Sequence, residues 1–236
     1  MQERYIKWWT PYLSREFEML VFGSGRGLPL TIFPTSFGRY HQNKDFGLVD
    51  SVAWLVDNER VTVYCPDSLD LDSFYNKGIH PADRIRTHIA YENVIVHDVF
   101  DFARREASTH RVGVCGASLG AYHAANIAFR HPDAVSHFIS LSGAFEITDF
   151  FDGYHDDNIY FNSPYQYLPN MPDPWKYNHM SIIIGTGEWD NTRHESMRLS
   201  GILNSKGIRH WLDDRKWCGH DWKYWRDMLP YYLSTL

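Results

Sequence analysis

The most informative segment of the chain is Arg111–Ala125, which reads R-V-G-V-C-G-A-S-L-G-A-Y-H-A-A. Its valine-containing start predicts a buried strand, and its Ala-rich end predicts a helix. Between them lies the pattern G-x-S-x-G, in which Gly116 and Gly120 flank Ser118. A serine in so tight a strand-to-helix turn needs small neighbours, because additional Cβ atoms would clash there. The turn exposes the hydroxyl at a helix N-terminus, so Ser118 is predicted to be a nucleophile; a plain glycine-rich turn is the alternative.

Outside this segment, expected strands alternate with expected helices. Besides Arg111–Cys115, the apolar runs that predict strands are Phe17–Phe22, Leu28–Pro34, Arg60–Pro66, Val135–Leu141, Ser181–Ile184 and Ile208–Asp213. Helical spacing of apolar residues predicts helices over Phe46–Asn58, Pro81–Glu106, Leu119–Arg130, Arg193–Lys206 and Asp221–Leu236. This alternation predicts an α/β sandwich, with a mainly parallel sheet covered by helices on both faces. The first two runs flank a Gly-Ser-Gly-Arg-Gly turn and are expected to pair as an antiparallel N-terminal hairpin.

The predicted nucleophile needs a base to activate it and an acid to orient the base. In this architecture the order along the chain is serine, acid, histidine, each after a later strand. His220 lies in a glycine-containing loop between the last predicted strand and the last helix, and of the 13 histidines it alone has that place. Two acids, Glu188 and Asp190, follow the strand that begins at Ser181. Asp190 is the preferred acid, and Glu188 is the alternative.

An oxyanion in such a site needs two converging backbone N–H groups. One is predicted to be that of Leu119, the residue after the serine. The other is expected from Pro34–Tyr40, P-T-S-F-G-R-Y, whose small residues let the backbone approach a substrate carbonyl. Phe37 is selected as this second donor, with Ser36 and Gly38 as alternatives.

These motifs together resemble those of the α/β-hydrolase superfamily. The G-x-S-x-G segment and the loops of Asp190 and His220 carry that likeness, while P-T-S-F-G-R-Y, S-P-Y-Q-Y-L-P-N and G-H-D-W-x-x-W are similar to the putative-esterase (esterase D-like) family. The resemblance spans nearly the whole chain. It implies acyl transfer from an ester or thioester to water through an acyl-serine. One departure is Phe37 with Gly38, where many members have two glycines, so the ring is expected to narrow the acyl site.

A segment without clear periodicity, residues 150–177, is dense in aromatic residues, Pro and Asn. Because it follows a predicted strand, it is expected to form a lid insertion over Ser118. The alternative is an aromatic surface excursion that covers the core. The candidates for a lid wall are four aromatic residues, Tyr160, Phe161, Tyr165 and Trp175.

Several other polar residues are expected to have no catalytic role. His97 and Asp98 lie within a predicted helix and are expected to form a surface pair, and His123 is expected to be packed behind the nucleophile. Acidic residues between 149 and 157 match no metal-loop spacing and are expected to form a solvated loop. Neither a metal nor another cofactor is therefore predicted.

The composition excludes several other classes of protein. With 236 residues, 44% hydrophobic and 22% charged, the chain fits one globular domain over 1–236 and is not disordered. A net charge of -6 lacks the basic excess of a nucleic-acid-binding protein. No apolar run approaches the roughly 20 residues of a membrane helix, and the first residues lack the apolar core of a signal peptide. Three cysteines are too few for a disulfide framework, so a cytoplasmic location is expected.

The sequence therefore favours a metal-independent serine hydrolase that cleaves small-molecule carboxylic esters with Ser118, His220 and Asp190. A thioesterase or acyltransferase with the same three residues is the first alternative, because a bound acceptor can replace water. A non-catalytic binding module that uses the aromatic cleft is the second. The presence of all three chemical groups argues against it.

Overall fold

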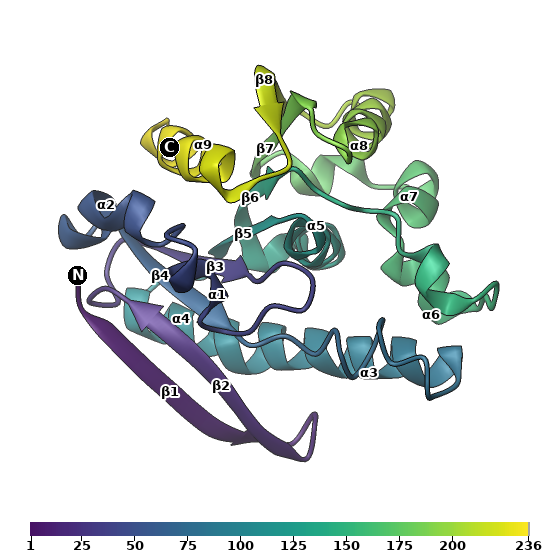
Figure 1. The fold of residues 1–236 in the computed structure, drawn as a ribbon, viewed down its shortest axis with the longest axis horizontal. Coiled ribbons are helices and arrows are strands. Elements are labelled where there is room, and N and C mark those ends of the chain that lie inside the picture. The colour runs from purple at the N-terminus through teal and green to yellow at the C-terminus, as the bar shows by residue number, and fades with distance from the viewer. Residues whose placement is uncertain (236) are drawn as a thin grey trace.

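The computed structural model describes residues 1–235 and contains one sheet of eight strands. Their order across the sheet is β1-β2-β4-β3-β5-β6-β7-β8. Their bounds are β1 Glu3–Thr10, β2 Arg15–Phe22, β3 Leu28–Phe33, β4 Val61–Pro66, β5 Val112–Ala117, β6 Val135–Leu141, β7 Ser181–Trp189 and β8 Trp211–Gly219. β1 with β2 and β2 with β4 are antiparallel, and all other neighbours are parallel. The predicted fold class is confirmed: a mainly parallel sheet begins with an antiparallel hairpin (Figure 1).

Helices cover both faces of this sheet (Figure 1). The α-helices are α1 Gln42–Asp45, α2 Ala53–Asp57, α3 Pro81–Asn93, α4 Phe100–Ala107, α5 Leu119–Arg130, α6 Asp157–Asn162, α7 Pro164–Tyr167, α8 Arg193–Ser205 and α9 Trp222–Ser234. A π-helical turn, η2 (Val94–Val99), joins α3 to α4. Short 3₁₀ turns are η1 Asp50–Val52, η3 Pro132–Ala134, η4 Thr148–Phe151, η5 Leu168–Asn170 and η6 Pro174–Tyr177. No helix within residues 1–235 is both long and apolar enough to cross a membrane.

The sheet separates two hydrophobic cores. Alternate residues of β2 point to opposite faces, so Met19 and Val21 belong to one core and Leu20 and Phe22 to the other. The first core lies beneath α3, α4, α5 and α8, and the second beneath α2 and α9. Both faces of the central strands are therefore buried, which is why these strands read as continuous apolar runs.

The pairing of the first predicted strands is wrong. The runs Phe17–Phe22 and Leu28–Pro34 do form strands, β2 and β3, but these two do not pair with each other. Instead β2 pairs with β1, in a register that places Tyr5 opposite Leu20, and β3 lies beyond β4 and parallel to it. No strand was predicted over the residues of β1, because an edge strand buries only one face. Its residues alternate between exposed and half-buried, a weaker signal than an apolar run.

Other predicted boundaries also differ. The strand expected over Ser181–Ile184 continues to Trp189, and the helix expected over Pro81–Glu106 is divided by η2. The helix expected over Phe46–Asn58 is a series of short turns, interrupted at Gly47, whose φ is 72°. The last strand begins at Trp211 and continues to Gly219, beyond the predicted end at Asp213. This strand is at the sheet edge, so its polar residues reach solvent and no apolar run marks its end.

Candidate active site

The tight turn between β5 and α5 has an unusual backbone at its centre. Ser118 has φ 55° and ψ -124°, a conformation that costs energy for any residue with a Cβ. Its N–H donates to the Leu141 carbonyl at 3.0 Å, and its carbonyl accepts from Ala144 N–H at 3.1 Å. Ser118 thus has a strained backbone between a buried strand and a helix. A turn of this kind holds a nucleophile above the edge of a sheet.

Steric contacts explain both glycines of the G-x-S-x-G pattern. A Cβ at Gly116 would lie 2.2 Å from the backbone of Gly120. A Cβ at Gly120 would lie 2.5 Å from the carbonyl oxygen of Pro34. Neither position accepts a side chain without movement of the backbone. The second contact also shows that the loop after β3 packs directly on the first turn of α5.

The two predicted oxyanion donors lie on these two adjoining segments. Leu119 is the first residue of α5, where backbone N–H groups have no acceptor within the helix. Phe37 has φ 61° in a turn that Gly38 N–H closes by donating to the Thr35 carbonyl at 2.9 Å. Its side chain is 58% exposed, and its ring centroid is 4.0 Å from that of Tyr75. An exposed aromatic ring therefore stands in the loop that carries the predicted second donor.

The structure brings the predicted base and the preferred acid into contact. His220 Nδ1 lies 2.9 Å from Asp190 Oδ1. The same carboxylate oxygen accepts from Thr192 N–H at 2.9 Å and from Thr192 Oγ1 at 2.9 Å, and Thr186 Oγ1 donates to Asp190 Oδ2 at 3.2 Å. The imidazole is half-buried and the carboxylate is buried. Asp190 is thereby held in one orientation, facing the ring.

Burial alone would raise the pKa of the Asp190 carboxyl. Hydrogen bonds from His220, Ser142 and Thr192 outweigh that effect and hold the pKa well below its usual range. The carboxylate is therefore ionised at neutral pH. An ionised carboxylate at Nδ1 keeps the ring proton on that nitrogen and leaves Nε2 as an acceptor.

Further side chains around this pair were not predicted from the sequence. The indole of Trp225 stands edge-on to the His220 ring, with centroids 5.1 Å apart, and its Nε1–H donates to Ser142 Oγ at 2.9 Å. Ser142 directly follows β6 and has φ 53°. Trp225 is the last letter of the G-H-D-W-x-x-W motif, which is the one sequence signal that pointed to it.

Two other acids near the pair have different partners. Glu188 is exposed, and its carboxylate accepts from Trp217 N–H at 3.3 Å, near the tips of β7 and β8. Asp221 accepts from Lys223 N–H at 2.8 Å and caps α9. Glu188 stands where the pairing of β7 with β8 is irregular, between Gly187 and Trp189, and no hydrogen bond joins it to the imidazole.

The aromatic segment at residues 150–177 begins near the proposed site and then leaves it. Phe150 packs edge-on against Tyr75, with ring centroids 5.1 Å apart. Farther along, the Phe161 carbonyl accepts from the Arg130 side chain, and Tyr177 OH donates to the Phe129 carbonyl at 2.8 Å. Arg130 and Phe129 form the end of α5, which is about 16 Å from its start at 1.5 Å per residue.

This course of the chain places the four candidate wall residues differently. Tyr160 stands edge-on to Phe161, with ring centroids 5.0 Å apart, and its OH accepts from Asn170 Nδ2 at 2.9 Å. Trp175 lies two residues before Tyr177, on the side of the molecule remote from Ser118, and is 64% exposed. Phe161 is at the same end of α5. Tyr165 is buried and its OH donates to the Glu195 carbonyl at 2.6 Å. Trp175 and Phe161 are therefore not positioned to line a pocket beside the serine.

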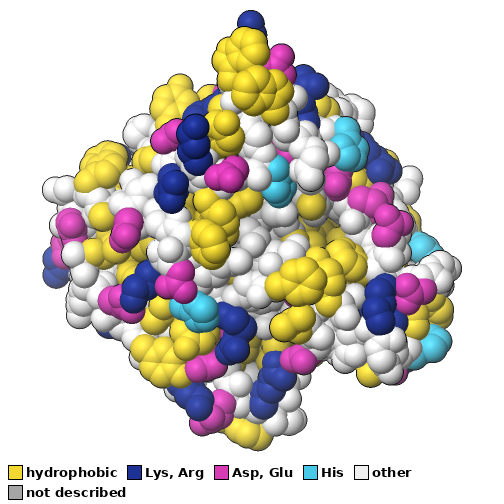
Figure 2. Space-filling model, in the orientation of Figure 1, with side chains coloured by type: hydrophobic (Ala, Val, Ile, Leu, Met, Phe, Trp, Pro, Cys, Tyr) yellow, Lys and Arg dark blue, Asp and Glu magenta, His cyan; other side chains and the backbone are white. Residues whose placement is uncertain are grey.

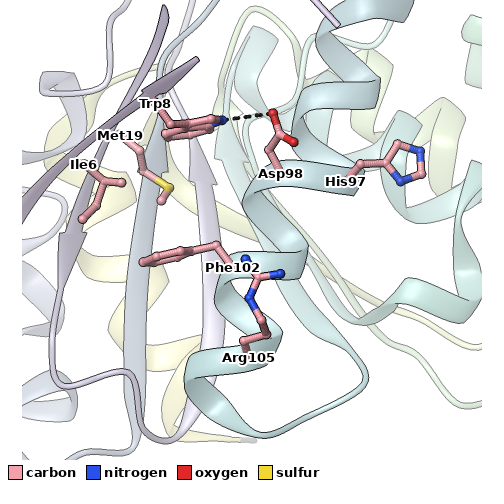
Figure 3. Close-up of a pocket in the computed structure, with 7 residues that line it drawn as sticks. All are labelled: Ile6, Trp8, Met19, His97, Asp98, Phe102 and Arg105. Atoms are coloured by element: carbon pink, nitrogen blue, oxygen red, sulfur yellow. Dashed lines mark hydrogen bonds between the residues drawn. The ribbon is translucent and has the colours of Figure 1, made fainter. Parts of the chain in front are cut away.

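A cavity lies between the N-terminal hairpin and the helical element η2–α4 (Figure 3). Its volume is about 410 Å³, and it is lined by Ile6, Trp8, Met19, His97, Asp98, Phe102 and Arg105. Asp98 accepts from the indole N–H of Trp8 at 3.0 Å, and the His97 ring stacks on Tyr12. His97 and Asp98 thus contact the hairpin and do not form the surface pair that was predicted. None of these residues belongs to the arrangement around Ser118.

Two of the acidic residues between 149 and 157 make structural contacts, whereas Asp149 and Asp157 are exposed. Asp152 pairs with Lys77 at 2.8 Å and with Arg84 at 2.6 Å. Asp156 caps α6 by accepting from Ile159 N–H at 2.9 Å. Within residues 1–235, no group of three or more His, Cys, Asp or Glu side chains is arranged to hold a metal ion.

Comparison with known proteins places this chain in a family. The family model described as "Putative esterase" matches residues 68–236, well over half of the chain. No curated protein sequence matches the chain significantly. Among solved structures, S-formylglutathione hydrolase (FrmB) from Staphylococcus aureus is 16% identical with a TM-score of 0.75, covering 99% of this chain and 96% of that one. The fluorophosphonate-binding serine hydrolase FphF from Staphylococcus aureus is 16% identical with a TM-score of 0.76, covering 99% and 97%.

A ferulic acid esterase from Anaeromyces mucronatus is 12% identical with a TM-score of 0.67, covering 99% of this chain and 90% of that one. At these identities the structural likeness shows the fold. The family model adds the enzyme class. The chain belongs to the putative esterase family and is a carboxylic-ester hydrolase of the α/β-hydrolase fold.

Proposed function

We propose that the chain cleaves small-molecule carboxylic esters through an acyl-serine intermediate. Ser118 is the nucleophile, His220 is the general base and acid, and Asp190 orients the imidazole. The observation that carries the proposal is the 2.9 Å contact between His220 and Asp190. Both residues follow strands, β8 and β7, whose carboxyl ends lie at the same edge of the parallel sheet as the strained turn of Ser118 after β5, with β6 between.

The first half of the reaction forms the acyl-enzyme. Asp190 accepts a hydrogen bond from the Nδ1–H of His220, which keeps that proton on the ring, so Nε2 is free to take the hydroxyl proton of Ser118 as Oγ attacks the ester carbonyl. The carbonyl oxygen becomes an oxyanion, which the N–H groups of Leu119 and Phe37 stabilise. When the tetrahedral intermediate collapses, the C–O bond to the alcohol breaks, and Nε2 returns its proton to the departing alkoxide.

The second half of the reaction releases the acid. A water molecule gives its proton to His220 Nε2 and attacks the acyl carbonyl. The same two N–H groups bind the second oxyanion. Collapse breaks the bond to Ser118 Oγ, which recovers the proton from Nε2. Every proton lost in one step is returned in another, so the cycle requires no metal and no cofactor.

The nature of the leaving group distinguishes the main proposal from its closest alternative. The compared structures carry the names S-formylglutathione hydrolase, which denotes a thioester substrate, and ferulic acid esterase, which denotes an oxygen ester. Either leaving group fits the chemistry of Ser118 and His220. We propose oxygen esters as the substrates, because the family model is one of esterases.

The proposed compartment and domain organisation follow the expectations from the sequence. Cys65, Cys115 and Cys218 are all free thiols, which fits a reducing, cytoplasmic environment. We propose one domain for residues 1–236. In that domain the start of the 150–177 segment borders the active site, and the rest covers the core beside α5, which supports the surface-excursion alternative over a full lid.

The decisive experiment is active-site labelling combined with a substrate panel. A fluorophosphonate probe is expected to add once to the wild-type protein, on the peptide that contains Ser118, and to leave Ser118→Ala unlabelled. A panel of p-nitrophenyl esters and matched acyl thioesters then ranks the leaving groups by kcat/KM. Higher kcat/KM for thioesters would establish the thioesterase alternative. Labelling at another residue would refute the proposed nucleophile.

A further inference from the structure

The segment after β4, residues 67–75, contacts both parts of the chain that carry the proposed oxyanion donors. It is not part of the proposed triad, and no catalytic motif points to it. Two carboxylates in it, Asp67 and Asp70, are buried, with 8% and 2% of their surface exposed. Buried carboxylates are costly unless they are paired, so their partners show what they hold in place.

Asp67 fixes the loop that contains Phe37. Both carboxylate oxygens contact Arg39 Nε, at 2.6 Å and 2.9 Å. Asp67 Oδ1 also accepts from the backbone N–H of Tyr40 at 3.2 Å. The two partners are the second and third residues after Phe37. One carboxylate therefore holds both a side chain and the backbone of the loop.

Asp67 is itself anchored to two rigid elements. Its N–H donates to the Glu18 carbonyl in β2 at 3.0 Å, and its carbonyl accepts from Tyr91 OH in α3 at 2.9 Å. Arg39 is tied to the same strand, because its NH2 group lies 2.9 Å from the Glu18 carboxylate. The Phe37 loop is thus connected through Asp67 to the sheet and to the long helix.

Asp70 fixes the helix that begins at Leu119. Its Oδ1 lies 2.9 Å from His123 Nε2, and both side chains are 2% exposed. His123 is in the second turn of α5. The Asp70 carbonyl accepts from Tyr75 N–H at 2.9 Å, and the Tyr75 ring lies against Phe37. The same short segment therefore reaches both sides of the proposed oxyanion hole.

We propose that Asp67 and Asp70 are positioning residues that set the separation of the two oxyanion donors. Asp67 locates the Phe37 N–H through Arg39 and Tyr40, and Asp70 locates the Leu119 N–H through His123. This inference rests on the proposed function, which supplies the reaction and the two donors.

The physical basis is the short range over which an oxyanion donor acts. Donors must lie about 2.7–3.1 Å from the position of the oxyanion. The Phe37 loop is a surface turn with a strained φ, so it needs an external restraint to keep its N–H in place. A displacement of about 1 Å in a catalytic group lowers the rate by up to about 100-fold. Neither carboxylate contacts the substrate in this account.

The test uses Arg39→Gln and Asp67→Asn in the full-length protein. We expect kcat for p-nitrophenyl acetate to fall by about 10- to 100-fold, with KM changed by less than about threefold. The inhibition constant of a trifluoromethyl ketone is expected to rise by the same factor as kcat/KM falls. Its tetrahedral adduct places an oxyanion in the hole, so a purely structural role would not produce this correlation.

A matched control is Arg4→Gln. Arg4 also donates to a carboxylate, that of Glu106, through two nitrogen atoms, and the pair is half-buried in β1 and α4. We expect this variant to lower the melting temperature about as much as Arg39→Gln and to leave kcat and ketone binding unchanged. Arg39 is half exposed, so Arg39→Gln is expected to disturb folding less than the substitutions of the buried carboxylates.

The second arm uses Asp70→Asn alone and combined with Arg39→Gln. The factors by which the two substitutions lower kcat are expected to multiply in the double variant, because the two act on different oxyanion donors. Folded Arg39→Gln and Asp70→Asn proteins with wild-type kcat and ketone affinity would overturn the inference. A lower kcat without weaker ketone binding would also overturn it. If Ser118→Ala retained activity, the proposed function would fail instead, so the two failures are distinguishable.

Discussion

His220 Nδ1 and Asp190 Oδ1 are 2.9 Å apart, although 30 residues separate them in the chain. The sheet register explains this contact. Trp189 in β7 is paired with Gly219 in β8, so the next residue of each strand leaves the sheet beside the other. The distance between the two groups is therefore set by two neighbouring parallel strands. Thr192 and Thr186 then fix the carboxylate within the loop.

This relationship predicts unequal effects of two acid substitutions. Asp190→Asn keeps the shape of the side chain but stabilises the wrong imidazole tautomer, so kcat is expected to fall by about 10⁴-fold. Glu188→Gln is the matched control, because Glu188 contacts the Trp217 backbone and not the imidazole. Its kcat is expected within about threefold of the wild-type value. Steady-state kinetics of both variants check the assignment, and a reversed order would show that Glu188 is the acid.

The second prediction concerns the pH dependence of stability. Burial, and next the neighbouring charge of His123, lower the pKa of His88 to about 3. The unfolded chain takes up a proton at His88 below about pH 6.5, whereas the folded chain does not. The unfolded state therefore binds more protons, and the free energy of unfolding falls as pH falls from 6.5 towards 3.

Urea unfolding at pH 6.5 and pH 5.0 measures this effect. Between these values the wild type is expected to lose about 1.5 kcal/mol more than His88→Gln, which cannot titrate. Esterase activity of His88→Gln shows that this variant is folded. Parallel losses in the two proteins would mean that His88 does not stay neutral in the native state.

The third prediction compares two glycines. Gly116→Ala is expected to destabilise the protein by more than about 3 kcal/mol, because the added Cβ would lie 2.2 Å from the Gly120 backbone. Gly201 is an exposed residue inside α8 with no atom within 4 Å of an added Cβ, and Gly201→Ala is expected to stabilise by about 0.5–1 kcal/mol. Chemical denaturation of both variants checks these signs. Equal effects would contradict the steric account of the turn.

The fourth prediction concerns the acyl site. Phe37→Gly removes an exposed ring next to a proposed oxyanion donor, and glycine adopts φ 61° without strain. We expect the ratio of kcat/KM for p-nitrophenyl octanoate to that for the acetate to rise about 10-fold, the scale on which pockets discriminate by size. Phe161→Ala, an equally exposed ring at the far end of α5, is the control and should not alter this ratio. A change of similar size in both variants would remove Phe37 from the acyl site.

The features near the active site that could be predicted from the sequence share a physical cause. The strand Val135–Leu141 and the helix Leu119–Arg130 have the bounds that were predicted, because both are buried and both are bounded by proline or glycine signals. The chain order of Ser118, Asp190 and His220 follows from the order of the strands. On the face seen in Figure 2, by contrast, exposed hydrophobic side chains form several separate groups, so exposure alone marks no single site.

The features that were not predicted depend on contacts between distant parts of the chain. β1 pairs with β2 through backbone hydrogen bonds, which amino-acid type specifies only weakly at an edge. The course of the 150–177 segment is set by its packing on the end of α5, and no periodicity in the segment encodes that direction. The bond from Trp225 to Ser142 joins residues 83 positions apart. Such contacts form only when the sheet is assembled, so local sequence patterns do not predict them.

If Ser118 forms the acyl-enzyme, its hydroxyl is required for turnover, and kcat/KM for p-nitrophenyl acetate in wild type and in Ser118→Ala measures this requirement. We expect a loss of at least about 10³-fold with an unchanged melting temperature, because removing a triad nucleophile leaves only the residual effect of substrate binding and the oxyanion hole. A folded Ser118→Ala protein with kcat/KM within about tenfold of wild type would contradict it.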